Sequence, residues 1–112
     1  GMVDLDAALL RMNGNRKILK ELISIYFEDG PVLLARISKS ADDGDAEALR
    51  QAAHALKGLV ANFSSGAAVA RLAQLDELGK SKVVSESVEL VGELYREIEH
   101  FNEALRRESQ KL

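Results

Sequence analysis

The chain has 112 residues, which fits one domain with a single hydrophobic core. Apolar residues make up 46% of it, aromatic residues only 4%, and proline occurs once, a composition that favours helices and argues against a β-sandwich or barrel. The net charge of -3 argues against a nucleic-acid-binding protein, and the lack of cysteine excludes disulfides and thiolate metal sites.

We expect neither a signal peptide nor a membrane-spanning helix in this sequence. Asp4 and Asp6 stand where a signal peptide would have basic residues. The longest apolar runs are a few residues, against the ~20 that a membrane-spanning helix needs. Gly1 before Met2 resembles the remnant of a removed tag, so we expect residues 2–112 to form the domain, in the cytoplasm and away from membranes.

A short amphipathic helix is predicted over residues 4–12, and Asn15, at the end of the following turn, can cap the next helix. That next helix has apolar residues at spacings of three and four. Pro31 interrupts it, but the apolar stripe keeps its phase across the proline, which favours one kinked helix over two separate helices.

Asp45 ends an acidic break in the sequence and is a good N-cap for a helix over residues 46–63. The turn at residues 64–66 leads into a further helix, and residues 79–85 form the next turn region. The last helix has apolar residues in steps of three and four, and its polar end is expected to fray from residue 106. Its apolar stripe is Val84, Val88, Val91, Leu94, Ile98, Phe101 and Leu105.

Short turns between long amphipathic helices place neighbouring helices antiparallel to one another. The predicted fold is therefore all-α: an up-down antiparallel four-helix bundle with a short additional N-terminal helix. A coiled coil is the alternative for the last helix alone, but its stripe has too few strict heptads to favour that arrangement.

The helix over residues 46–63 carries a histidine on the side away from its core. Five of its residues fall within about 40° of one direction around the helix axis: Leu49, Ala53, Leu56, Val60 and Phe63. His54 lies roughly 140° from that direction, so we expect it in solvent. Arg50, Lys57 and Ala61 flank it, and Gly58 lies one turn further along.

A lone histidine in a small helical domain is usually incidental, and Lys57 would then be a solvated surface charge. Gly58 is harder to explain in that way, because glycine in an exposed helix interior costs about 1 kcal/mol relative to alanine. Neutral imidazole is a good nucleophile near pH 7. A phosphoryl group on His54 could pair with Lys57, and Gly58 would leave room for the protein that brings it. Hydrolysis fits poorly, because no acid–base partner or metal cluster lies nearby in sequence.

Residues 54–58 (His-Ala-Leu-Lys-Gly) match the H-x-x-K-G core of histidine-containing phosphotransfer (HPt) domains. The flanking segments 44–49 and 72–76 resemble the flanks of such domains, as does the helix interrupted at residues 28–31. The resemblance spans about residues 5–105. It implies a phosphorelay intermediate of two-component signalling, which is a phosphocarrier rather than an enzyme.

The resemblance also implies roles for residues and partners. His54 would accept a phosphoryl group from the aspartyl phosphate of a receiver domain and pass it to another receiver. Lys57 would stabilise the phosphate, and Gly58 would provide clearance. Because magnesium and the acid chemistry belong to the receiver in this family, we expect no metal or other cofactor on this chain. The implied partners are response-regulator receiver domains, with a hybrid sensor histidine kinase as a further candidate, and the implied state is a monomer.

A polar residue on the helix after the motif often orients the imidazole in this family, and Gln74 and Asp76 are the two candidates. Arg50 and Ala61 are further possible neighbours of the histidine. Many family members have a glycine shortly after the motif where this chain has residues 63–65, which leaves the register of the next helix, and the choice between Gln74 and Asp76, open.

Two other classes of function compete with phosphotransfer. One is a helical-bundle adaptor that binds a receiver or kinase without being phosphorylated. The other is a small helical enzyme, for which the sequence offers no second catalytic group at a supporting spacing. Leu10, Ile18 and Leu59 are the candidate docking residues near His54, and His100 is expected to be an ordinary surface residue.

Overall fold

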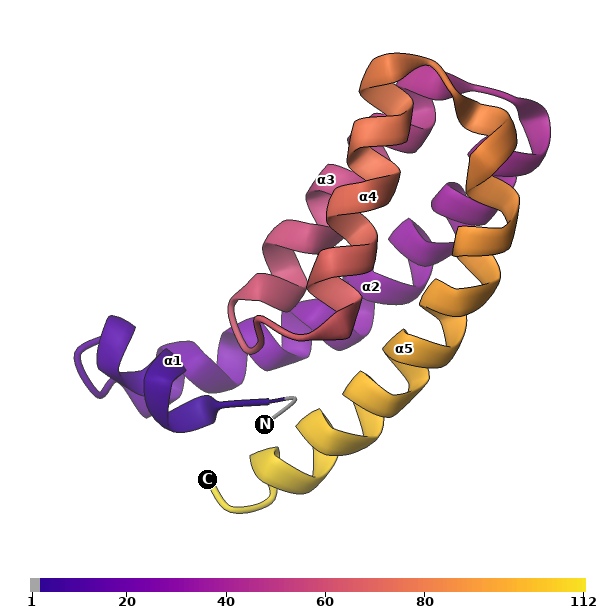
Figure 1. Cartoon of the computed structure of the whole chain (residues 1–112). Coiled ribbons are helices and arrows are strands. Elements are labelled where there is room, and N and C mark those ends of the chain that lie inside the picture. Colours follow the sequence, from indigo (N-terminus) through magenta and orange to yellow (C-terminus); the bar gives the residue numbers. More distant parts are fainter. Residues whose placement is uncertain (1–2) are drawn as a thin grey trace.

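The computed structural model describes residues 3–112, which are mostly α-helical (Figure 1). The elements in chain order are α1 (Leu5–Arg11), α2 (Arg16–Asp43), α3 (Ala46–Ala61), α4 (Ala67–Ser81), the short 3-10 helix η1 (Val84–Glu86) and α5 (Ser87–Ser109). The long helices α2 to α5 run alternately up and down, and α1 lies beside the start of α2 (Figure 1). The predicted four-helix bundle with a short N-terminal helix is confirmed.

Polar side chains define where three of the helices begin. Asp4, Asn15 and Asp45 precede α1, α2 and α3. In each case the side-chain oxygen accepts a hydrogen bond from the backbone N–H three residues later, at 3.0 or 3.1 Å. α2 ends at Gly44, whose φ of 70° is a left-handed conformation that glycine adopts without strain. Side-chain caps of this kind stabilise a helix by about 1 kcal/mol each, so local sequence fixes these boundaries.

α2 runs through Pro31 as one helix of 28 residues, so the prediction of one helix in place of two is correct. Its buried residues lie on both sides of the proline, with Ile23 before it and Ile37 after it. Packing on both sides outweighs the loss of one backbone hydrogen bond at Pro31.

The aromatic residues of the core connect α2, the segment after α3, and α5. The ring of Tyr26 lies edge-on to Phe101 at 5.2 Å and to Phe63 at 6.3 Å between ring centres. Its hydroxyl donates a hydrogen bond to Asn102 Oδ1 at 2.5 Å. Burial raises the pKa of Tyr26 well above its ordinary value, so the hydroxyl stays protonated and keeps this bond. Tyr26 therefore packs in the core with its polar end paired.

The start of the last helix differs from the prediction. Val84–Glu86 forms a 3-10 turn, and α5 begins only at Ser87. The change in helical phase leaves Val88 52% exposed, although it was predicted to lie on the apolar stripe. The buried stripe of α5 resumes at Val91.

The end of α5 also differs, because the helix continues to Ser109 instead of fraying from Arg106. Leu105 is fully buried there, and the Arg106 guanidinium lies 4.9 Å from the centre of the Phe27 ring. This cation–π contact and the buried leucine hold the last turns against α2.

Candidate functional site

His54 lies on the solvent side of α3, where the sequence pattern places it. Its side chain is 66% exposed. The opposite side of the same helix is fully packed into the core. Those buried residues are Leu49, Ala52, Ala53, Leu56 and Val60. The core holds α3 in place, and the imidazole itself remains open to a second protein.

Few side-chain atoms project from the surface beside His54, because two small residues lie there. Gly58 and Ala61 are both exposed. A Cβ atom placed on Gly58 would meet no atom within 4 Å, so the fold of this chain does not require glycine there. The space above Gly58 is open within this chain, although glycine is a weak helix former at this position.

Asp76 reaches His54 from α4. Its Oδ2 atom lies 3.2 Å from His54 Nδ1 and 3.3 Å from Lys57 Nζ. The Asp76 side chain is 3% exposed, so one buried carboxylate holds both the imidazole and the lysine. The structure thus places Asp76, and not Gln74, against the histidine.

The charge state of Asp76 determines which imidazole nitrogen is free. Burial, the largest single influence, raises its pKa, but hydrogen bonds from His54 and Lys57 and the charges of Lys80 and Lys57 together lower it below the ordinary value. Asp76 is therefore an ionised carboxylate at neutral pH and can only accept hydrogen bonds. The neutral imidazole must then carry its proton on Nδ1, which leaves the lone pair of Nε2 facing solvent.

Gly79 allows α4 to approach α3 closely enough for this contact. A Cβ atom on Gly79 would lie 2.8 Å from the backbone oxygen of Ala46 and 2.8 Å from the backbone nitrogen of Arg50. Those are backbone atoms of α3 that cannot shift cheaply. The sequence placed Gly79 in a turn, but it is a buried residue inside α4, one turn after Asp76. It therefore helps to set the depth at which Asp76 lies beneath His54.

Gln74 lies on a different side of α4 and does not orient the imidazole. Its Oε1 atom accepts a hydrogen bond from Arg71 Nη1 at 2.8 Å. Arg71 also contacts Glu93 at 3.0 Å and Glu97 at 2.9 Å on α5. The two-residue step from Gln74 to Asp76 turns the side chain by about 200° around the helix, so only one of them can face α3.

Of the remaining candidates, neither Arg50 nor Ala61 forms a hydrogen bond with His54. The Arg50 guanidinium pairs with Glu47 at 2.5 Å on its own helix. Sequence reasoning missed Lys80, whose Nζ atom lies 4.0 Å from Asp76 Oδ2. The spacing of four residues between an aspartate and a lysine on one helix is the signal that could have indicated it.

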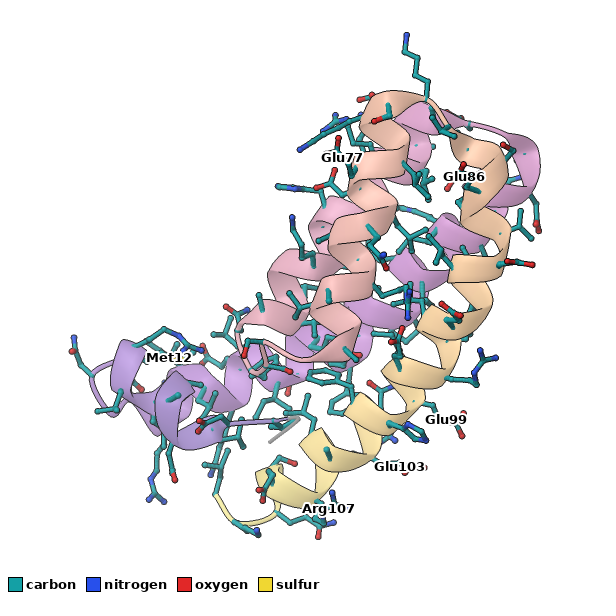
Figure 2. All side chains as sticks on the ribbon, in the orientation of Figure 1. Met12, Glu77, Glu86, Glu99, Glu103 and Arg107 are labelled. Atoms are coloured by element: carbon teal, nitrogen blue, oxygen red, sulfur yellow. The ribbon has the colours of Figure 1, made fainter. Side chains whose placement is uncertain are left out.

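Two of the candidate docking residues are exposed. Leu10 on α1 is 80% exposed and Ile18 at the start of α2 is 43% exposed, whereas Leu59 on α3 is partly buried against the core. His100 is exposed on α5, as expected, among surface charges. Figure 2 shows three of those charges, Glu99, Glu103 and Arg107, along α5.

Two further findings concern the described part of the chain. Across residues 3–112, no group of three or more histidine, cysteine, aspartate or glutamate side chains is placed to hold a metal ion. None of the helices in that range combines the length and the apolar character needed to cross a membrane.

Comparisons with known proteins agree with the sequence resemblance. The family model of the Hpt domain matches residues 21–108. The fold is similar to the crystal structure of histidine-containing phosphotransfer protein B (HptB) from Pseudomonas aeruginosa PAO1, with a TM-score of 0.85 and 20% sequence identity over 99% of this chain and 96% of that chain. No curated protein matches the sequence.

Proposed function

Because the chain belongs to the Hpt domain family, we propose that His54 is the residue through which it carries a phosphoryl group. Hpt domains are phosphocarrier modules, not enzymes, and the chain is a histidine phosphotransfer intermediate of two-component signalling. The observation that supports His54 is its geometry: an exposed imidazole whose Nδ1 is held at 3.2 Å by a buried carboxylate.

The transfer step follows from the tautomer that Asp76 enforces. The lone pair of His54 Nε2 attacks the phosphorus of a receiver's aspartyl phosphate, the N–P bond forms, and the P–O bond to the receiver's aspartate breaks. The receiver keeps a carboxylate. The imidazole becomes a phosphorylated imidazolium whose positive charge includes the proton on Nδ1. Asp76 already faces that proton, so its negative charge stabilises the product, and the reverse steps deliver the phosphoryl group to another receiver.

Lys57 and Gly58 assist this step in different ways. Lys57 lies one turn from His54 and offers a positive charge to the three phosphoryl oxygens, an interaction of the kind worth about 1.5–3 kcal/mol. Gly58 leaves the surface low enough for the receiver to bring its aspartate within bonding distance of Nε2.

The partners are response-regulator receiver domains. We place the docking surface around His54, with the exposed Leu10 and Ile18 at its apolar edge. A hybrid sensor histidine kinase is a further candidate partner. We also propose that residues 2–112 act as one monomeric domain in the cytoplasm.

Phosphoryl transfer from a receiver tests the assignment of His54. The wild-type protein is incubated with a receiver domain phosphorylated on its aspartate, and acid-labile, base-stable label is measured on the Hpt chain. Wild type should become labelled, and His54→Gln should not, while His100→Gln should label as wild type does. Equal labelling of His54→Gln and wild type would exclude His54 as the acceptor.

The same experiment separates phosphotransfer from the adaptor function. An adaptor would bind the receiver but would never carry label, whether or not His54 is present. Binding of His54→Gln to the receiver with an affinity close to that of wild type, together with loss of label, would show that the histidine acts in chemistry and not in docking.

A further inference from the structure

Three positively charged or protonated nitrogens converge on one oxygen of Asp76. His54 Nδ1 lies at 3.2 Å, Lys57 Nζ at 3.3 Å and Lys80 Nζ at 4.0 Å, all measured to Oδ2. The other oxygen, Oδ1, is buried and has no hydrogen-bond partner among residues 3–112. All of the nearby nitrogens therefore lie at Oδ2, and the single negative charge of Asp76 faces two ammonium groups and an imidazole.

Lys57 cannot pair fully with both Asp76 and a phosphoryl group on His54. In this structure its ammonium group is bound to Asp76, although it lies one turn from the proposed phosphoacceptor. A phosphoryl group on Nε2 of His54 carries two negative charges into solvent beside α3. Turning Lys57 toward that group would remove one of the two hydrogen-bond donors from Asp76 Oδ2, because the imidazolium formed at His54 still donates only its Nδ1 proton. A buried carboxylate that loses a donor is destabilised.

Lys80 is placed to compensate for that loss. It lies four residues after Asp76 on α4, and its side chain is 54% exposed, so it is free to change rotamer. Its Nζ needs to move by about 1 Å to reach hydrogen-bond distance from Oδ2. The other cations near the cluster are less suitable. Arg50 is paired with Glu47, and Lys82 lies beyond the end of α4.

We propose that Lys80 is a positioning residue that takes the place of Lys57 on Asp76 when Lys57 turns to the phosphoryl group on His54. This inference rests on the proposed function, because it assigns to Lys80 a role in the phosphorylated form. Asp76 would remain paired in both forms, with Lys57 in the resting protein and Lys80 in the phosphorylated one. The alternative is an exposed lysine that makes an ordinary helix-surface pair with no link to Lys57.

The resting protein provides the first test, because it needs no phosphate. The pKa of the Asp76 carboxyl is measured by NMR in wild type, Lys57→Met, Lys80→Met and the double variant. If the two lysines substitute for each other, each single change should raise the pKa of Asp76 slightly, and the double change should raise it by more than the sum. Additive effects, or no effect of Lys80→Met in the Lys57→Met background, would overturn the exchange.

The phosphorylated protein provides the second test. At equilibrium with a phosphorylated receiver domain, Lys80→Met should lower the ratio of phosphorylated to unphosphorylated His54 by about two- to fivefold, the range expected for one partly exposed ion pair. Lys80→Arg should restore it. Lys39→Met is the matched control, because Lys39 also pairs with an aspartate four residues away, at 2.9 Å, on the exposed end of α2.

The outcomes separate the two proposals. A wild-type ratio in Lys80→Met, an equal fall in Lys39→Met, or no rescue by Lys80→Arg would each contradict the role of Lys80. Absence of label on wild type would contradict the proposed function itself, and the pKa of Asp76 in the lysine variants would still decide whether Lys57 and Lys80 exchange.

Discussion

α4 makes one ion cluster with each of its neighbouring helices, and the two clusters differ in how completely they are paired. Toward α5, the side chain of Arg71 is 23% exposed, and all three of its guanidinium nitrogens contact Gln74, Glu93 or Glu97 at 2.8 to 3.3 Å. Toward α3, Asp76 faces two ammonium groups and an imidazole, one of its oxygens has no hydrogen-bond partner in the described chain, and Nε2 of His54 faces solvent.

The difference indicates what each cluster is for. The Arg71 cluster directs every guanidinium nitrogen to an acceptor within the protein, so it can hold α4 against α5. The Asp76 cluster keeps the His54 imidazole exposed and places two ammonium groups near a single carboxylate. Under the proposed function, a phosphoryl group on His54 would balance this positive charge.

The largest expected difference between the two clusters is in the rate of phosphoryl transfer after the central residue of each, Asp76 or Arg71, is replaced. Asp76→Ala removes a hydrogen bond of the kind worth about 1.5–3 kcal/mol, so transfer to His54 should slow by about tenfold to a hundredfold. The proton on Nδ1 should also become less populated, as seen in the 15N shifts of the imidazole ring. Asp76→Asn keeps an acceptor oxygen and should lie between wild type and Asp76→Ala.

Arg71→Met is the matched change in the other cluster. It should lower the free energy of unfolding by about 1–2 kcal/mol, because two glutamates and one amide lose their partner. The rate of phosphoryl transfer and the 15N shifts of His54 should stay as in wild type. A slowing of transfer in Arg71→Met as large as that in Asp76→Ala would remove the distinction between the two clusters.

Gly79 tests whether the close approach of α3 and α4 shapes the site. Alanine normally stabilises a helix relative to glycine by about 1 kcal/mol, but at position 79 the new Cβ would collide with backbone atoms of α3. We expect Gly79→Ala to destabilise the protein by a net of about 1–2 kcal/mol in denaturant unfolding and to slow transfer as well. Gly92→Ala on α5 meets no atom within 4 Å and should be stabilising.

Replacing Gly58 by alanine should raise stability but lower the rate of phosphoryl transfer. A Cβ fits there within the chain, so Gly58→Ala should raise the free energy of unfolding by about 1 kcal/mol. It should lower the rate of transfer from a phosphorylated receiver, because the extra methyl group stands where the partner approaches. A stabilised variant with unchanged transfer would mean that Gly58 is not needed for clearance.

The smallest expected effect is in the pH dependence of stability. Because folding lowers the pKa of Asp76, its stabilising contribution is fully present above the pKa of about 3.9 in the unfolded chain. That contribution is lost as the pH falls through the lower pKa of the folded state. The difference in unfolding free energy between wild type and Asp76→Asn should therefore shrink between pH 5 and pH 2, and a constant difference would contradict the charged state of Asp76.

The helices and much of the site could be predicted because their signals are local. The N-caps lie next to the helices that they begin, and His54, Lys57 and Gly58 share one helix face. The choice between Gln74 and Asp76 could not be made, because it depends on how α4 is rotated against α3. That rotation is fixed by non-local packing, above all by Gly79 against the backbone of α3, which the sequence presents only as a glycine near a turn.

The central claim is that the cluster beneath α3 leaves Nε2 of His54 as the phosphoacceptor. The most direct test is 31P and 15N NMR of the chain after transfer from a phosphorylated receiver domain, with the histidine rings labelled. We predict one phosphohistidine signal, at His54, with the phosphorus bonded to Nε2 and a proton on Nδ1. Phosphorus bonded to Nδ1 of His54, or to His100, would contradict the account.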